Sequence, residues 1–388
     1  MSMINLDYIS ANPLLAEVKN AMIQALKKDY GNPSSPHQLG EEAEEELERA
    51  REKVSRLINA SSYGEIIFTS CGTESNNHAI KGIALANKDR GKHIITSAVE
   101  HNSVLKPIRT LNSLGYDTTV IPVDHDGKVN TDDVYKAIQE DTILISIMHA
   151  NNEMGTIQPI KEIAHIAREK KITFHCDAVA SVGVIPVDVQ ELEVDLLSFA
   201  ANQFNGPSGV GALYIRNGID VWPLLDGGTQ EKQKRGGTEN LIGIIGMGVA
   251  SEIALKEMDL RIAHVKRLRE RLLKGLKENF NNIILNGHPD YSLPNLVSVS
   301  LKYIEGESIV LLLDQENIGV STKSPCASGS LRASHVLVAM GRDYSDAQSS
   351  LVITFGRDTT ETEIERLLEV LIKAVSTLRK TSPLAPQK

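Results

Sequence analysis

The stretch EIIFTSCGTESNN (Glu65–Asn77) combines a short apolar run, a turn that contains glycine, and the start of a helical pattern. Units of strand, turn and helix build α/β proteins, in which ligands collect at the carboxyl ends of the parallel strands. The amides of this turn and the Thr73 hydroxyl can bind a phosphate at the helix N-terminus. Thr73 can equally serve only to cap the helix.

Outward from this stretch, the first two-thirds of the chain alternate short β-rich runs with helical patterns. Several of the runs are apolar at every position, as expected for strands that are covered on both faces. We therefore predict an α/β fold with a mostly parallel seven-stranded sheet. Its strands are expected at Glu65–Ser70, His93–Ala98, Thr118–Val123, Thr142–His149, Ile172–Asp177, Leu196–Ala201 and Gly211–Ile215.

The pattern changes after a long helical stretch at Leu241–Phe280, and an α+β unit begins near Ile283. This unit ends in a helix for which Thr360 is the expected N-cap, because acidic residues follow it in the first turn. The elements expected in it are strands at Leu296–Leu301 and Leu351–Phe355 and helices at Glu307–Glu316 and Thr360–Leu378. We predict a large α/β domain over residues 14–260, and a small α+β domain formed by residues 1–13 and 261–388.

The composition argues against several classes of function. With 388 residues, 41% hydrophobic and 23% charged, the chain resembles an ordinary globular protein. A net charge of −9 and 4% aromatic residues argue against a broad nucleic-acid surface. Three cysteines are too few for a disulfide framework, and no apolar run approaches the ~20 residues of a membrane-spanning helix. The first residues lack the pattern of a signal peptide, so a cytoplasmic protein is expected.

Polar clusters follow several of the predicted strands, where ligands of α/β proteins bind. They are Val99–His101, His149–Glu153, His175–Val179 and Gly236–Asn240, flanked in the chain by GNPSSPH (Gly31–His37) and SPCAS (Ser324–Ser328). In this order the series resembles the cysteine desulfurases of the NifS/IscS type, which are similar to class-V aminotransferases. The resemblance covers nearly the whole chain, and the spacing from Cys326 to His335 is similar to that of the IscS-type group.

The resemblance implies the type-I fold of pyridoxal-phosphate-dependent transferases, and a homodimer with sites at its interface. It implies that Asp177 pairs with the pyridine nitrogen of pyridoxal phosphate and that His101 stacks on the ring. The implied cofactor-binding set is Thr73, His101, Asn152, Asp177 and, from the neighbouring subunit, Thr238. Cys326 matches the catalytic nucleophile, which takes sulfur from cysteine and carries it as a persulfide to a scaffold protein.

The sequence departs from the family where the family has a lysine that forms a Schiff base with the cofactor. In SFAANQFNGP (Ser198–Pro207), Gln203 occupies the lysine position. An amide can neither form an imine nor remove the α-proton of a substrate. Four more positions differ from the residues with which the family contacts cofactor or substrate: Ala180, Ala200, Asn202 and Val352.

These departures predict that the protein binds no pyridoxal phosphate and has lost the desulfurase activity that depends on it. The first hypothesis is then an IscS-like partner of an IscU-type scaffold protein in iron–sulfur cluster assembly. Cys326 acts in this hypothesis as a sulfur carrier, or as a ligand of a 2Fe-2S cluster shared with the scaffold. Two alternatives stay open: an active cysteine desulfurase that binds pyridoxal phosphate non-covalently, and a dimeric assembly subunit without catalytic activity.

The other thiols and imidazoles receive no catalytic role. Cys326 lies in a serine-rich segment, where an exposed thiolate suits sulfur or metal chemistry. Cys71 and Cys176 end predicted strands and are expected to be packed rather than reactive. His37 and His149 have no assigned role.

Overall fold

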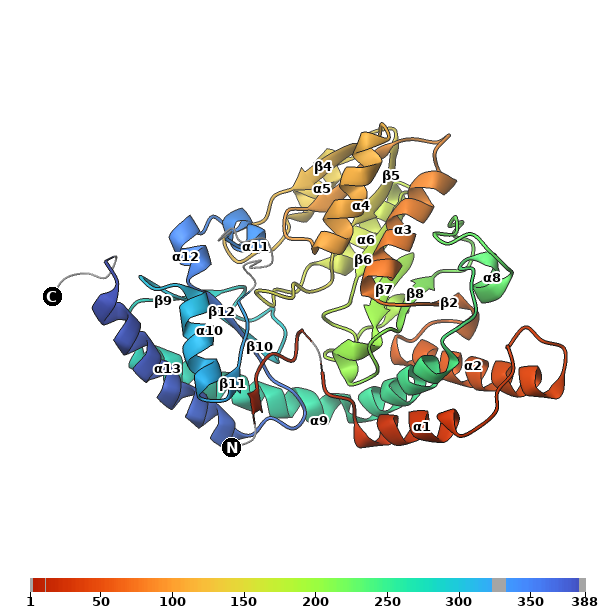
Figure 1. The fold of residues 1–388 in the computed structure, drawn as a ribbon. Coiled ribbons are helices and arrows are strands. Elements are labelled where there is room, and N and C mark those ends of the chain that lie inside the picture. Colours follow the sequence, from red (N-terminus) through yellow and green to blue (C-terminus); the bar gives the residue numbers. More distant parts are fainter. Residues whose placement is uncertain (1–2, 11, 323–332, 384–388) are drawn as a thin grey trace.

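The computed structural model describes residues 3–10, 12–322 and 333–383. Its largest element is a seven-stranded sheet with the strand order β2-β8-β7-β6-β5-β3-β4 (Figure 1). Its strands are β2 (Ile66–Thr69), β3 (His93–Ser97), β4 (Asp117–Ile121), β5 (Thr142–Ser146), β6 (Thr173–Asp177), β7 (Leu196–Ala200) and β8 (Gly211–Ile215). Strands β3 to β7 pair in parallel, and β8 is antiparallel to both of its neighbours. The predicted α/β fold with a mostly parallel seven-stranded sheet is confirmed.

The direction of the edge strand β2 decides where its turn lies. Because β8 is antiparallel to both β2 and β7, β2 runs in the same direction as the parallel strands. Its carboxyl end therefore reaches the same edge of the sheet as the ends of β3, β5, β6 and β7. The turn that follows leads into helix α3 (Gly72–Ala86), so the polar clusters of the sequence meet at one edge.

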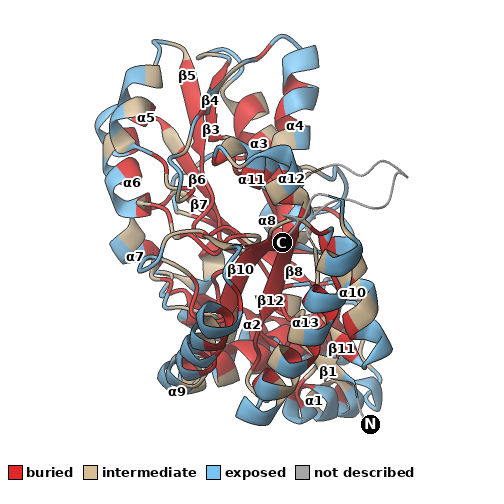
Figure 2. Cartoon of the chain, turned by 90° about the vertical axis from the view of Figure 1, so that its left-hand side faces the viewer, coloured by how far each residue is buried: buried red, intermediate tan, exposed pale blue. Residues whose placement is uncertain are grey.

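Helices cover both faces of this sheet, and most of its strands are buried along their whole length (Figure 2). Helices α3 and α4 (Asn102–Ser113) pack on one face. Helices α2 (Gln38–Leu57), α6 (Ile160–Glu169) and the first half of α9 (Leu241–Asn279) pack on the other. Within β2, Ile67 packs on the face covered by α3 and α4, and Phe68 packs on the opposite face, as the alternation of side chains along a strand requires.

A second, three-stranded antiparallel sheet has the order β12-β10-β9. Its strands are β9 (Ile283–Asn286), β10 (Leu296–Leu301) and β12 (Ser350–Thr354), and its core includes helices α10 (Gly306–Gln315) and α13 (Glu361–Thr381). Strand β1 (Ile4–Asn5) pairs in parallel with β11 (Ile318–Gly319) beside it. Helix α9 packs against α2 at one end and against α13 at the other, and Figure 1 shows it running beneath both sheets. The domain boundaries stay a prediction.

The remaining helices connect these elements. They are α1 (Ala16–Leu26), α5 (Thr131–Ala137), α7 (Val189–Leu192), α8 (Gln230–Gln233), α11 (His335–Ala339) and α12 (Tyr344–Gln348). Thr360 caps α13 through a capping box with Glu363, as predicted. In the part of the chain that the structure describes, none of the helices has the length and apolar character needed to cross a bilayer. The cytoplasmic location stays a prediction.

Candidate functional site

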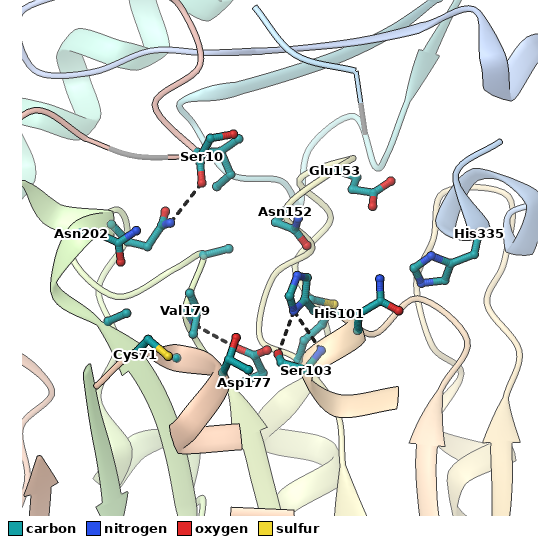
Figure 3. A pocket seen from close by; sticks show the side chains of 18 residues that line it. Ser10, Cys71, His101, Ser103, Asn152, Glu153, Asp177, Val179, Asn202 and His335 are labelled. Carbon is teal, nitrogen blue, oxygen red and sulfur yellow. Dashed lines mark hydrogen bonds between the residues drawn. The ribbon is translucent and has the colours of Figure 1, made fainter. Parts of the chain in front are cut away.

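A cavity of about 530 Å³ lies at the carboxyl edge of the large sheet (Figure 3). Turns after β2, β3, β5, β6 and β7 contribute to its wall, together with the N-terminal segment and the start of α11. Five of the sequence-predicted positions line it: Thr73, His101, Asn152, Asp177 and Gln203. Thr238 is not among its lining residues; its hydroxyl accepts a hydrogen bond from Asn32 at 3.5 Å within the same chain.

The turn between β2 and α3 forms one end of this cavity. Cys71 is the N-cap residue of α3, and its side chain makes no capping hydrogen bond. Thr73 already lies in the first turn of the helix, so the alternative that it only caps α3 is wrong. A Cβ on Gly72 would lie 2.5 Å from Val179 Cγ2, so the close approach of this turn requires glycine. The uncapped amides and the helix dipole make this end suitable for an anion such as a phosphate.

A buried carboxylate lies at the floor of the cavity. Asp177 is 4% exposed, and it accepts hydrogen bonds from Asn76 Nδ2 at 2.7 Å and from the Val179 amide at 3.0 Å. Burial raises the pKa of this carboxyl, although the Val179 amide, His101 and Asn76 act in the opposite direction. A cation placed against Asp177, such as the protonated nitrogen of a pyridine ring, would stabilise its ionised form.

His101 lies beside this carboxylate and caps helix α4. Its Nδ1 accepts a hydrogen bond from the Ser103 amide at 3.1 Å and lies 2.7 Å from the Ser103 hydroxyl. An amide always donates, so the neutral imidazole carries its proton on Nε2. Figure 3 shows His101 and Asp177 close together at the floor of the cavity, with Asn202 on one side and His335 on the opposite side.

Gln203, which the sequence predicts at the lysine position of the family, lies in the wall of the cavity. Its side chain is turned to the N-terminal segment, because Nε2 donates to the Ile9 carbonyl at 3.0 Å. The side-chain amide of Asn12 donates to the Gln203 carbonyl at 3.0 Å and strengthens the same contact. The side-chain NH₂ group of Gln203 therefore has a main-chain hydrogen-bond partner and links the cavity wall to the N-terminal segment.

The other positions at which the sequence departs from the expected residues lie in the cavity wall or close to it. Ala180, Ala200 and Asn202 line the cavity. Val352 is buried in β12 and belongs to an apolar cluster with Ile9 and Ala180. A substrate carboxylate that enters from this side meets no guanidinium from position 352, so its binding depends on other polar groups of the cavity, such as Asn152.

Sequence reasoning missed the buried carboxyl group of Glu100, next to His101. The side chain is 0% exposed, and its Oε1 accepts hydrogen bonds from the Ser97 hydroxyl at 2.6 Å and the Met148 amide at 2.9 Å. Its carbonyl oxygen accepts a hydrogen bond from His335 Nε2 at 3.0 Å. Glu100 thus ties the ends of β3 and β5 together behind His101. No signal in the sequence separates it from an exposed strand-end glutamate.

The substitution Glu100→Gln is expected to flatten the dependence of stability on pH. Burial raises the pKa of Glu100 to about 8 from 4.5, so the folded protein retains a proton that the unfolded chain releases above its ordinary pKa. Stability from this group therefore falls as pH rises from 4.5 to 8, by up to ~1.4 kcal/mol per pH unit. Urea unfolding at pH 5, 6.5 and 8 should show that the free energy of unfolding of the variant, relative to that of the wild type, increases with pH. A constant difference between the two proteins contradicts the prediction.

The thiols and remaining histidines differ in how they meet the expectations. Cys176 is buried, as predicted, but Cys71 is exposed and lines the cavity, so the expectation that it is packed is wrong. His37 caps helix α2, a role the sequence did not reveal. His149 is buried against Ser181, and burial lowers its pKa to about 4. Cys326 lies outside the described residues, and among those residues no cluster of three or more suitable side chains is placed to bind a metal.

Comparisons with known proteins agree with this geometry. The model of the family Aminotransferase class-V matches residues 4–367. The chain is 51% identical to the cysteine desulfurase IscS of Dictyoglomus turgidum, over 98% of this chain and 96% of that protein. A structure titled NifS-like protein superposes with a TM-score of 0.91 at 38% identity, over 97% of this chain and 100% of that one. Another, titled SspA in complex with cysteine, gives 0.81 at 32% identity, over 92% and 99%.

The comparisons correct the expectation that the protein binds no pyridoxal phosphate. Class-V aminotransferases and their desulfurase relatives use this cofactor, and the match to them extends over the whole described site. The anion-binding turn, the Asp177 carboxylate and the His101 ring lie in one cavity, so its residues fit the phosphate and the pyridine ring. The inference failed because the residues that fit the phosphate and the pyridine ring, Thr73, His101 and Asp177, come from elements other than that of Gln203.

Proposed function

The chain belongs to the class-V aminotransferase family, and we propose that it is a cysteine desulfurase that binds pyridoxal phosphate without a covalent bond. The observation that carries the proposal is the cavity in which Thr73, His101 and Asp177 converge while Gln203 points its amide to Ile9. The comparisons favour an active desulfurase over the first hypothesis, in which the activity is lost. Cysteine as the substrate is supported by the names of these relatives and by the cysteine complex of SspA.

Three groups of the chain hold the cofactor in this proposal. The turn at Cys71–Thr73 binds the phosphate, Asp177 accepts the proton of the pyridine nitrogen, and His101 lies against the ring. When bound, pyridoxal phosphate supplies an electron-accepting ring that withdraws electrons from the α-carbon of an amino acid. Asp177 supports this role, because a buried carboxylate keeps the ring nitrogen protonated. Gln203 contributes no proton transfer, and His101, whose Nε2–H can donate a hydrogen bond into the cavity, is the candidate residue that orients the substrate.

The overall reaction transfers one sulfur atom. L-cysteine and the Cys326 thiol give L-alanine and the Cys326 persulfide, with the C–S bond of the substrate broken and one S–S bond formed. Neither an oxidant nor a reductant is needed, because the two thiols and the two products balance. In the proposal the persulfide sulfur passes to an IscU-type scaffold for iron–sulfur cluster assembly. The protein acts as a homodimer in which Thr238 serves the neighbouring subunit.

The purified protein is expected to bind added pyridoxal phosphate and to release it on dialysis, because position 203 offers no amine. The binding should give a visible absorbance band that disappears with the cofactor. Asp177→Asn is expected to weaken binding about tenfold to a hundredfold, since a hydrogen bond to a charged group contributes ~1.5–3 kcal/mol. Titration of both proteins and an assay for L-alanine released from L-cysteine test the proposal. A wild-type protein that neither binds the cofactor nor forms L-alanine contradicts it.

A further inference from the structure

The connection between β8 and α9 contains a segment, residues 226–238, that is fixed to the β2–α3 turn from outside the cavity. Two ion pairs make this connection. Arg51 of α2 pairs with Glu231, whose carboxylate also accepts the Phe68 amide of β2, and Arg235 pairs with Glu74 of α3. The side chains of the first pair are 4% and 1% exposed, and those of the second are 20% and 11% exposed. The β2–α3 turn reaches the cavity wall through Cys71, Gly72 and Thr73. None of the four paired residues lies in that wall.

The first ion pair binds the outer edge of β2, which is an edge strand of the large sheet. Glu231 receives both Nη atoms of Arg51, at 2.7 and 2.8 Å, and also accepts the Phe68 amide at 2.8 Å. Arg51 Nη1 also donates to the Ile66 carbonyl at 2.9 Å. The pair therefore satisfies the main-chain groups that an edge strand leaves without a neighbouring strand. It fixes β2 just before the strand enters the cavity turn.

The backbone conformation of the segment is energetically unfavourable, and the first ion pair stabilises it. Three successive residues without a glycine, Glu231, Lys232 and Gln233, have φ values of 46°, 58° and 64°. Left-handed backbone is unfavourable for such residues and persists only where the surroundings enforce it. The buried bidentate ion pair of Glu231 holds this backbone, together with the hydrogen bond from Lys232 Nζ to the Gly64 carbonyl at 2.9 Å.

The second ion pair reaches the anion-binding end of the cavity. Arg235 Nε donates to Glu74 Oε1 at 2.9 Å, and the Ser70 amide donates to Glu74 Oε2 at 2.8 Å. Glu74 follows Thr73 directly in the first turn of α3. A carboxylate at this position repels a phosphate that binds the same helix N-terminus, unless a cation neutralises it. Arg235 supplies that cation and at the same time holds the turn.

We propose that Glu231 and Arg235 are positioning residues that hold the Cys71–Thr73 turn in the geometry and charge state that bind a phosphate. The inference rests on the proposed function, because the phosphate is that of pyridoxal phosphate. Neither residue touches the cofactor, and both act through the turn. The loss of either one is expected to weaken the binding of ligands with a phosphate and to leave the binding of ligands without a phosphate almost unchanged.

The test compares pyridoxal phosphate with pyridoxal, which lacks the phosphate. Dissociation constants are measured by absorbance for the wild type, Arg235→Gln and Glu231→Gln. Arg216→Gln is a matched control, since its partly buried ion pair with Asp195 lies at the far end of β8, away from the cavity. For the first two variants we expect the constant for pyridoxal phosphate to rise about tenfold, and the constant for pyridoxal to change less than twofold. Equal changes for both ligands, or no change for either, overturn the inference.

A second readout needs no bound pyridine ring. In a Cys326→Ser background, Cys71 is the exposed thiol of the chain and Cys176 is buried, so alkylation by iodoacetamide reports on the turn. Inorganic phosphate is expected to slow this alkylation when the turn is that of the wild type, and to have little effect in Arg235→Gln. Arg235→Gln also serves as the test variant if Glu231→Gln does not fold. If the wild type binds neither aldehyde, the proposed function fails, and phosphate protection alone decides the inference. Equal protection in wild type and variant overturns it.

Discussion

The substitution Gln203→Lys is expected to convert pyridoxal phosphate from a dissociable ligand into a covalently attached group. A lysine at this position offers an amine to the aldehyde of the cofactor, whereas the native amide donates only to the Ile9 carbonyl. Borohydride should then fix the cofactor to the variant through dialysis and denaturation, and leave the wild type without it. Mass spectrometry of the tryptic peptide that contains position 203 measures the difference.

The same variant should also accelerate L-alanine formation. A positioned general base contributes about 10²–10⁴-fold, and Gln203 supplies none of this. The gain is expected in the rate at saturating cysteine, and the Michaelis constant should stay high because Val352 gives no guanidinium to the substrate carboxylate. Gln203→Met is the matched control, since it also loses the contact with Ile9 but has no amine. A rate for Gln203→Lys equal to that of Gln203→Met contradicts the prediction.

Replacement of Cys326 by serine is expected to abolish persulfide formation and to leave cofactor binding unchanged. A hydroxyl has no sulfur to accept and is a much weaker nucleophile than a thiolate. Persulfide on the protein is measured by mass spectrometry after incubation with L-cysteine, and cofactor binding is measured by absorbance. Cys71→Ser is the control, because Cys71 is an exposed thiol in the same cavity. If Cys71→Ser loses the persulfide and Cys326→Ser keeps it, the assignment of the nucleophile is wrong.

The parts of the fold that depend on local apolar patterning were predictable. The strand expected at Leu296–Leu301 has these bounds in the structure, and the seven predicted strands of the large sheet all form within a few residues of their expected ends. Such runs bury side chains on both faces, and the sequence displays this directly. The two-residue strand at Ile4–Asn5 was missed, because its pairing with Ile318–Gly319 depends on contacts far apart in the chain.

The site was predictable where residue type alone carries the chemistry. Thr73, His101, Asn152 and Asp177 follow strands whose carboxyl ends meet, so their common cavity follows from the order of the sheet. The exposure of Cys71 was not predictable, because it depends on the path of one turn. The Arg51–Glu231 ion pair spans 180 residues of sequence, and neither member differs in the sequence from an ordinary exposed charged residue.

In the proposed function, Gln203 donates to Ile9 and leaves the cofactor without a covalent bond, and this has a consequence for how the protein responds to its surroundings. A cofactor held without a covalent bond obeys mass action, so the fraction of protein molecules that carry pyridoxal phosphate depends on its free concentration. Each tenfold excess over the dissociation constant adds about 1.4 kcal/mol to the resistance of the native state to heat. In a melting curve the midpoint should therefore climb with the logarithm of that concentration, whereas a relative with a Schiff base would stay nearly constant.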